Sequence, residues 1–200
     1  MKIYSYVIPY ASGFAPNPFW GYCTLATCKP RIRRTAKEGD WVIGTGSVRN
    51  VGNERLVYAM KVTEVMPLED YWVDKRFEKK KPGKGKKRLV GDNIYYRDKK
   101  GNVRQYFPSK HSYPDKENLE NKEHDLKGEN VLISKSGKFY YFGREAPDIP
   151  RSLLCLVKKG PGHKCDFPPS TIDRFLQWIK KKKSGVNGYP WSYPRQQKSC

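Results

Sequence analysis

Residues 39–47 read GDWVIGTGS, and this stretch decides most of what can be inferred about the fold. A polar Gly-Asp turn leads into a run of aromatic and β-branched residues, which predicts a strand that ends at a glycine-containing segment. The two glycines could form a phosphate-binding loop, a plain turn, or the floor of a pocket for a flat ligand. No G-x-x-x-x-G-K-[ST] motif is present, and the next strong element is another strand, so Walker-type and dinucleotide-binding loops do not fit. The two remaining interpretations of this segment are a plain turn and the floor of a pocket.

The segments around this stretch predict a mostly β chain. Residues 2–9 (KIYSYVIP) have strand propensity, and residues 55–65 (RLVYAMKVTEV) alternate, with Leu56, Tyr58, Met60 and Val62 on one face. Two hairpins are predicted at residues 93–107, turning at Lys-Lys-Gly-Asn, and at residues 130–143, turning at Lys-Ser-Gly. Residues 153–159 (LLCLVKK) are a further candidate strand.

Helices are predicted in two places. Residues 67–77 (PLEDYWVDKRF) begin with proline and acids and favour a short helix. Residues 170–183 predict an amphipathic helix, because Ser170 and Asp173 can form a capping box and apolar residues follow at i, i+3, i+4 and i+7, namely Ile172, Phe175, Leu176 and Ile179. The fold class expected from these elements is α+β: a small, mostly antiparallel, partly open β-barrel flanked by short helices, with an α+β sandwich as the alternative.

The domain organisation follows from length and local composition. The 200 residues allow a single domain, which we place at residues 1–183, and residues 184–200 are expected to form a flexible tail. Residues 79–88 (KKKPGKGKKR) predict a mobile basic loop, since lysines with Pro and Gly cannot build a core. The basic segment 28–40 and the polar segment 111–129 are expected to be connections.

The charge balance points to polyanions. Forty Lys and Arg stand against twenty Asp and Glu, a net charge of +20, which concentrates nucleic acid near the surface. No run is apolar enough for a membrane span or a signal peptide, so we expect no membrane partner and a cytoplasmic location. The five cysteines include no C-x-x-C pair, which favours reduced thiols over a disulfide framework.

No motif announces a metal site or hydrolase chemistry. His163 and Cys165 with Cys23 and Cys28 lack zinc spacing, so no metal or other cofactor is expected. A Cys/His catalytic pair has no telling spacing either, and His111 is interpreted as a loop histidine.

Aromatic residues interleaved with basic ones are the stronger signal. In residues 17–34 (NPFWGYCTLATCKPRIRR), Phe19, Trp20 and Tyr22 precede a group of cations. Rings for stacking and cations for the adjoining phosphates are the combination that binds single bases.

These residues also resemble a known family. The segment YSYVIPYASGFAPNPFWGYCTLATCKPRIRRTAKEGDWVIGTGS, followed by LVYAMKVTEVMPLEDYW, GDNIYY, HS, NVLIS and FYYFG, is similar to the nucleotide modification associated domain of the second type. Beneath that family lies a similarity to the PUA-like superfamily, which includes the EVE, YTH and ASCH domains. The resemblance implies a compact barrel that holds a flipped-out, often modified base between aromatic rings. It also implies association with base-modification systems, such as those of phage or mobile elements, and favours the pocket-floor interpretation of GTGS.

The favoured hypothesis is a non-catalytic module that recognises a modified base in DNA or RNA. The expected base-binding residues are Trp20, Tyr22, Thr45, Gly46, Ser47, Tyr71 and Trp72, and the expected phosphate-binding residues are Lys29, Arg31, Arg33 and Arg34. One alternative is an amidohydrolase-like enzyme for a modified nucleoside, for which the resemblance to ASCH members implies Lys29 and Glu64. The other is a general nucleic-acid-binding protein that contacts mainly phosphate.

Overall fold

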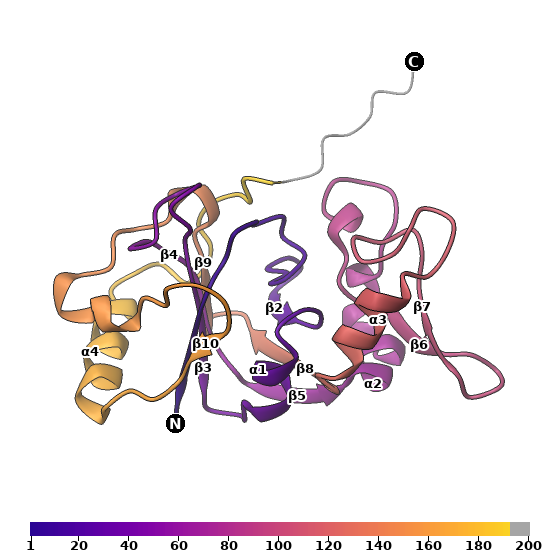
Figure 1. Ribbon diagram of the computed structural model, residues 1–200, viewed down its shortest axis with the longest axis horizontal. Helices are drawn as coiled ribbons and strands as arrows, with labels where there is room; N and C mark the ends of the chain where they lie inside the picture. Colours follow the sequence, from indigo (N-terminus) through magenta and orange to yellow (C-terminus); the bar gives the residue numbers. More distant parts are fainter. Residues whose placement is uncertain (193–200) are drawn as a thin grey trace, which may run out of the picture.

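The computed structural model describes residues 1–192, whose strands form two open sheets and a hairpin (Figure 1). The six-stranded sheet has the order β10-β1-β3-β4-β9-β11, with bounds His163–Lys164, Ile3–Val7, Trp41–Thr45, Leu56–Lys61, Phe139–Tyr141 and Gly185–Val186. The three-stranded sheet has the order β2-β8-β5, with bounds Tyr22–Leu25, Asn130–Lys135 and Glu64–Pro67. The hairpin pairs β6 (Tyr95–Arg97) with β7 (Val103–Gln105).

Helices pack against these sheets (Figure 1). The α-helices are α1 (Pro30–Thr35), α2 (Leu68–Val73), α3 (Leu119–Leu126) and α4 (Pro169–Ile179). Short 3-10 helices occupy Lys75–Lys80, Arg88–Val90, Gly143–Glu145 and Arg151–Leu156. Within residues 1–192, no helix has the length and apolar character needed to cross a membrane. The chain therefore mixes helices with mostly antiparallel strands, as predicted, but the sheets do not close into the predicted barrel.

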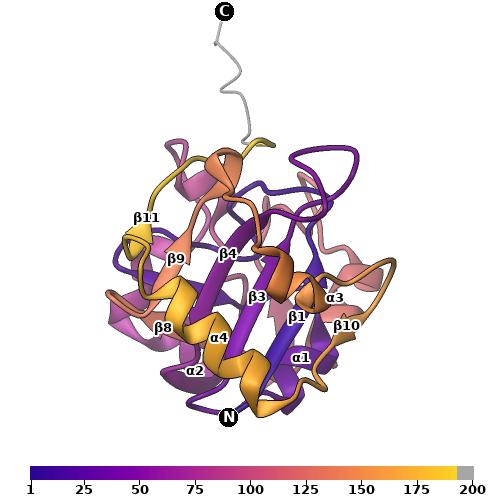
Figure 2. The same ribbon diagram turned by 90° about the vertical axis from the view of Figure 1, so that its left-hand side faces the viewer.

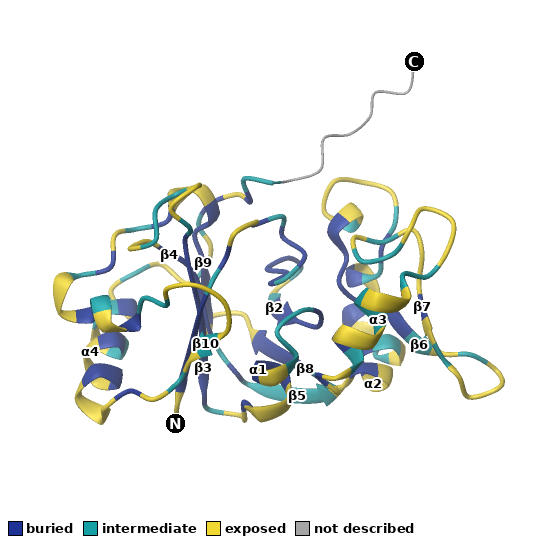
Figure 3. Cartoon of the chain, viewed as in Figure 1, coloured by how far each residue is buried: buried dark blue, intermediate teal, exposed yellow. Residues whose placement is uncertain are grey.

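The elements stack in layers. Helix α4 crosses the outer face of β3 and β4 (Figure 2), where Phe175 packs edge-on against Trp41 with ring centroids 5.5 Å apart. The three-stranded sheet lies on the other side, and its central strand is buried on both faces (Figure 3). In β8, Leu132 joins the core of the six-stranded sheet, whereas Val131 and Ile133 join a second core beneath α2. Burial on both faces explains why these strands read as continuous apolar runs.

Two predicted strand arrangements are wrong, for a shared reason. Residues 55–65 are not one strand, because the chain turns after Lys61 and β5 pairs with β8 in the other sheet. The 130–143 hairpin is also wrong: β8 pairs with β2 and β5, and β9 pairs with β4. A local pattern of apolar residues predicts a strand, but it does not tell where that strand ends or which sheet it enters. The 93–107 hairpin is confirmed as β6 and β7.

Three predicted connections or strands have helical structure instead. The basic segment 28–40 contains α1, and the polar segment 111–129 contains α3. The segment 153–159 is not a strand, since residues 151–156 form a 3-10 helix. Helix α3 is polar on most of its surface and lacked an apolar stripe, which is the signal that sequence analysis uses.

The C-terminal part is confirmed in outline and corrected in its bounds. Helix α4 buries Ile172, Phe175 and Ile179, as the periodicity predicted, but it begins at Pro169 and ends at Ile179. The tail prediction is wrong for its first residues, because β11 pairs in parallel with β9. Residues 193–200 of the predicted tail lie outside the described residues.

The basic stretch 79–88 is only in part a solvated loop. Lys80 ends a 3-10 helix and is 1% exposed. Its Nζ donates to the main-chain oxygens of Asn17 and Tyr22 and to Oδ1 of Asn17, at 2.8 to 3.1 Å. Burial lowers the pKa of Lys80 to about 8. This lysine anchors the loop to the second core.

Candidate functional site

Three titratable side chains from separate segments meet between the two layers. Cys28 lies between β2 and α1, His111 lies in the loop after β7, and Asp125 lies on α3. His111 Nδ1 is 2.6 Å from Asp125 Oδ2, and His111 Nε2 is 3.5 Å from Cys28 Sγ. The imidazole therefore connects a carboxylate on one side with a thiol on the other. This is the hydrogen-bond order of a thiol–imidazole–carboxylate triad.

Asp125 organises this cluster and is fully buried. Its Oδ2 accepts hydrogen bonds from His111 and from the Tyr95 hydroxyl at 2.7 Å, while its Oδ1 accepts the Cys28 amide at 2.6 Å. Burial raises the pKa of Asp125, but these donors outweigh burial and hold it below its usual range. A single carboxylate thus fixes both the imidazole and the main chain that carries the thiol.

Arg33 binds the main chain around Cys28 and Asp125. It is buried, and its guanidinium donates to the main-chain oxygens of Cys28 and Asn130, each at 2.8 Å, and to that of Asp125. These three bonds tie α1, α3 and β8 together behind the thiol. A side chain with its donors committed in this way is not free to bind phosphate.

The main chain at the thiol adopts an unusual conformation. Cys28 and Lys29 are consecutive non-glycine residues with φ of 57° and 43°. The left-handed region costs such residues about 1–2 kcal/mol each, and strained residues cluster at functional sites. Pro30 then begins α1, where its fixed φ suits the first turn. The bonds from Asp125 and Arg33 maintain this conformation.

The charge state of His111 follows from its partners. Burial disfavours the imidazolium, but hydrogen bonds with Asp125 and Cys28 outweigh burial and raise the pKa of His111 to about 10. At neutral pH the ring is therefore protonated, so Nδ1 donates to the carboxylate and Nε2 donates to Sγ. The positive ring and the Cys28 sulfur are therefore hydrogen-bonded neighbours, 3.5 Å apart.

The thiol and the imidazole line a pocket of about 400 Å³. The pocket lies between β1 and the loop after β7, and its lining residues are Tyr6, Val7, Ile8, Pro9, Tyr10, Ser12, Phe14, Ala15, Cys28, Lys29, Lys110, His111 and Ser192. The Phe14 ring lies 4.7 Å from the His111 ring, and Lys29 Nζ lies 4.7 Å from the centre of the Tyr6 ring. Burial lowers the pKa of Lys29. Aromatic residues and two lysines thus line the same pocket as Cys28.

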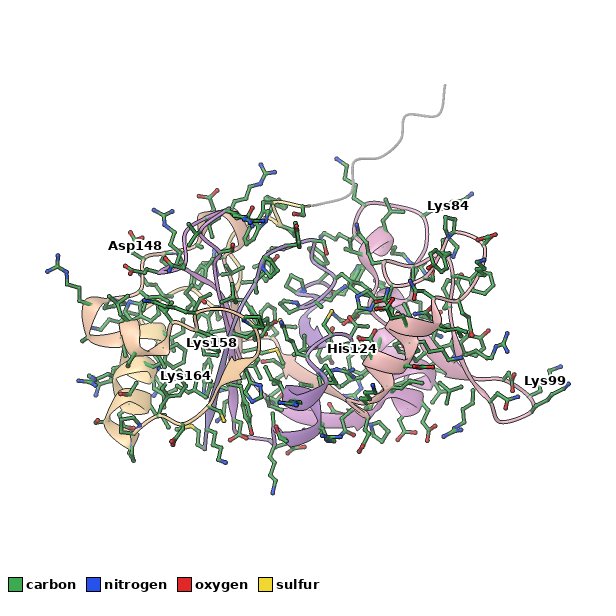
Figure 4. All side chains as sticks on the ribbon, in the orientation of Figure 1. Lys84, Lys99, His124, Asp148, Lys158 and Lys164 are labelled. Carbon is green, nitrogen blue, oxygen red and sulfur yellow. The ribbon has the colours of Figure 1, made fainter. Side chains whose placement is uncertain are left out.

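Two further hollows adjoin this pocket. One shares Lys110 with it and includes Lys84 and Tyr106, and the other shares Cys28 and Lys29 and includes Arg31 and two histidines. A separate hollow beside Val7 includes Lys158 and Lys159. In Figure 4 the labelled residues Lys84, His124 and Lys158 mark these three hollows across the width of the molecule. Cations therefore flank the pocket on several sides.

The GTGS segment lies elsewhere. Thr45 is buried at the end of β3, where its hydroxyl donates to Tyr6 O, and Gly46 is buried beside Val51 and Gly52. The main-chain oxygen of Ser47 accepts hydrogen bonds from the amides of Asn50 and Gly52 and so closes a turn. Ser47 lines the hollow that contains Lys158 rather than the pocket at Cys28. The structure places these residues in a strand end and a turn.

The predicted aromatic residues lie around the second core. Tyr71 is buried, and its hydroxyl donates to Asp92 at 3.0 Å. Tyr22 packs edge-on against Phe77, and Trp20 packs edge-on against Phe19. Trp72 is half-buried and stacks on Tyr96, with Lys81 Nζ 4.3 Å from its ring centre. The structure does not bring these rings together with Thr45, Gly46 and Ser47 in one pocket.

The predicted cations and Glu64 separate into different roles. Lys29 lines the pocket, Arg31 lines the adjoining hollow, Arg34 is exposed and Arg33 is internal. Glu64 accepts two hydrogen bonds from Arg76, at 2.7 and 2.9 Å. Among the contacts of the described residues, none joins Glu64 to Lys29, so the structure does not assemble the alternative catalytic pair.

Cys28, His111 and Asp125 each offer one atom that could bind a metal ion, and these three atoms lie within 4.8 Å of one another. The bonding pattern does not fit a shared ion. The imidazole lies between the other two groups, with one nitrogen on the carboxylate and the other on the sulfur. An ion bound by the sulfur and one ring nitrogen would leave Asp125 as a partner of the ring rather than a ligand.

No local spacing in the sequence encodes this cluster. The cysteine and histidine are 83 residues apart, and the histidine and aspartate are 14 apart. The one available signal was the presence of a histidine and a cysteine in polar or basic segments rather than in strands.

Comparison with known families gives one match. A family model described as nucleotide modification associated domain 2 matches residues 1–197. Neither curated proteins nor solved structures gave a significant match. Because the family model spans almost the whole sequence, the chain belongs to the nucleotide modification associated domain 2 family.

Proposed function

We propose that this protein recognises a modified base, in a nucleic acid or as a nucleotide, in the pocket between β1 and the loop after β7. The observation that carries the proposal is the composition of that pocket, which combines aromatic rings with lysines in one hollow of about 400 Å³. Pockets of about 300–1,000 Å³ with rings and a few convergent polar groups bind small ligands. The family's association with nucleotide modification supports a nucleic acid or a nucleotide as the ligand.

The rings provide the surface for a base. Tyr10 is 75% exposed at the pocket, and Phe14 is buried against the His111 ring. The faces of aromatic side chains stack on an unstacked base whatever its identity. Polar groups at the pocket edge then distinguish the substituents on the base. The resemblance to PUA-like domains, which hold a flipped-out base, supports the same arrangement.

The cations provide the contacts to phosphate. Lys110 lies between the base pocket and the hollow of Lys84, and Lys29 lies between the base pocket and the hollow of Arg31. A strand that passes over these hollows would keep its phosphates near cations while one base enters the pocket. The net charge of +20 adds long-range attraction. We therefore assign phosphate contacts to Lys29, Arg31 and Lys110 and leave Arg33 out.

The test is a change at the exposed ring. We expect Tyr10→Ala to weaken binding of single-stranded oligonucleotides that carry a modified base by about tenfold, since stacking of one base contributes about 1–3 kcal/mol. Titrations at about 150 mM salt limit the contribution of non-specific phosphate contacts. The panel contains oligonucleotides with single modified cytosines or adenines and their plain counterparts.

Tyr189→Ala is the matched control, because Tyr189 is 74% exposed and is not among the residues that line the pocket. We expect this variant to bind like the wild type. Equal affinity of both variants and the wild type for every oligonucleotide would overturn the assignment of the pocket. Equal affinity of the wild type for modified and plain strands would reduce the function to general nucleic-acid binding.

A further inference from the structure

We propose that Cys28 is a nucleophile that removes an acyl group from a modified nucleotide, with His111 as acid and base and Asp125 as the residue that positions His111. The nucleotide part of this proposal rests on the proposed function, whereas the nucleophile rests on the geometry of the three side chains. The thiol lines the same pocket that we assign to the base. A substituent on a base in that pocket would lie beside the sulfur.

Cys28 differs from Cys23 and Cys155. Cys23 is fully buried, and burial raises its pKa to about 12, which keeps it a thiol. Cys155 is exposed, and its sulfur lies 3.9 Å from the Thr171 hydroxyl. Cys28 is partly accessible, lies at a pocket and is hydrogen-bonded to an imidazole nitrogen. Accessibility and a nearby cation are what distinguish reactive cysteines from structural ones.

The arrangement supports rigid positioning rather than a chance contact. The Cys28 amide, the His111 ring and the Tyr95 hydroxyl all bind one carboxylate, and Arg33 holds the Cys28 carbonyl. These bonds fix the sulfur and the imidazole relative to each other. They commit Nδ1 to the carboxylate, so that only Nε2 faces the sulfur and an incoming substrate.

The chemistry suited to this relay is acyl transfer. The Cys28 thiolate forms a bond to the carbonyl carbon of an amide or ester on the base substituent. The carbon–nitrogen or carbon–oxygen bond then breaks, and the leaving group takes the proton from His111 Nε2, which leaves a thioester on Cys28. Water attacks the thioester and gives a proton to His111, so that the carboxylic acid leaves and the ion pair returns. Water is the only co-reactant.

Lys29 supplies positive charge next to this step. It follows Cys28 directly, lines the same pocket and packs over the Tyr6 ring at 4.7 Å. Negative charge develops on the carbonyl oxygen as the sulfur attacks, and a cation held in place nearby stabilises it.

The nucleophile is tested with p-nitrophenyl acetate, which needs no nucleotide-binding pocket. We expect release of p-nitrophenol by the wild type with a transient gain in protein mass of one acetyl group, and peptide mapping should place that group on Cys28. Cys28→Ser should abolish the adduct at this position. His111→Gln should slow turnover by about 100-fold or more. Cys155→Ser is the control and should leave turnover unchanged.

Thermal unfolding of each variant shows whether it is folded, and iodoacetamide provides a measurement on the unaltered protein. In the wild type, Cys28 should be alkylated faster than the exposed Cys155, despite its smaller accessibility. Alkylation of Cys155 at the greater rate, or acetylation spread over cysteines and lysines without turnover, would overturn the nucleophile.

The substrate class is tested with oligonucleotides that carry an N-acetylated cytosine or adenine and with their unacetylated counterparts. We expect loss of the acetyl mass from the oligonucleotide, dependent on Cys28. Turnover of p-nitrophenyl acetate without deacylation of any oligonucleotide would overturn the substrate class alone. Binding of modified oligonucleotides without either reaction would overturn the enzyme and leave the proposed function in place.

Discussion

Asp125→Asn is expected to lower the free energy of unfolding by about 3 kcal/mol, because breaking a buried charged pair leaves the remaining groups unpaired. The carboxylate accepts hydrogen bonds from His111, Tyr95 and the Cys28 amide and is fully buried. An amide has one acceptor oxygen, and its NH₂ group would face one of these donors. Denaturant unfolding measures the change, provided that the dependence of the unfolding free energy on denaturant concentration is the same in the variant and the wild type.

Asp148→Asn is the control for this variant. Asp148 is 81% exposed and pairs with Arg55 at 3.1 Å, so its loss should cost at most about 1 kcal/mol. A cost for Asp125→Asn no larger than that of Asp148→Asn would contradict the role of Asp125 as the centre of the cluster.

The pH dependence gives a second check on the same variant. The folded protein raises the pKa of His111 from 6.5 to about 10 and lowers the pKa of Asp125 below 3.8. The pair therefore contributes fully between about pH 4 and pH 6.5, and its contribution is lost as pH rises through about 10 or falls through the lowered pKa of the carboxyl. We expect the difference in melting temperature between wild type and Asp125→Asn to shrink from about pH 6 to about pH 10. A constant difference would show that the contact with the carboxylate does not raise the pKa of His111.

Gly46→Ala is expected to destabilise the fold by about 2–3 kcal/mol through overpacking. An added Cβ would overlap the main-chain oxygen of Gly52 and lie 2.6 Å from Val51 Cγ2. The oxygen belongs to the turn that follows β3, so relief requires a shift of main chain rather than of a flexible side chain. Denaturant unfolding again measures the loss.

Gly52→Ala is the matched control in the same turn, since its Cβ would meet nothing within 4 Å but its φ is +98°. It should cost about 1–2 kcal/mol from main-chain strain alone. Folded Gly46→Ala should bind nucleotides like the wild type, because Gly46 is not among the residues that line the pocket. Loss of binding in the folded variant would instead support the pocket-floor interpretation of GTGS.

The strands and the C-terminal helix could be predicted from the sequence because their signals are local. The apolar run at residues 41–45 and the periodicity of Ile172, Phe175 and Ile179 correspond to β3 and α4. Sheet membership was not accessible, since Leu132 and its neighbours in β8 are buried on both faces and lack a register signal. For the same reason the barrel expected from short, alternating strands became two open sheets.

The candidate site could be predicted from the sequence only in part. Lys29 and Arg31 were identified from basic residues near aromatic ones, and both line connected hollows. The contacts of Cys28 with Asp125 span 97 residues, so they depend on the packing of α1 against α3. Composition likewise cannot separate the buried Lys80 from the lysines beside it, because only its tertiary partners differ.

The most direct test of base binding in this pocket is protection of Cys28 from alkylation. The wild type is treated with iodoacetamide in the presence of the oligonucleotide panel, and mass spectrometry of peptides gives the rates at Cys28 and at the exposed Cys155. We expect at least one modified oligonucleotide to slow alkylation of Cys28 by about tenfold or more at saturation while Cys155 reacts at an unchanged rate. An unchanged rate at Cys28 across the whole panel, under conditions where the oligonucleotides are bound, would contradict the assignment of the pocket.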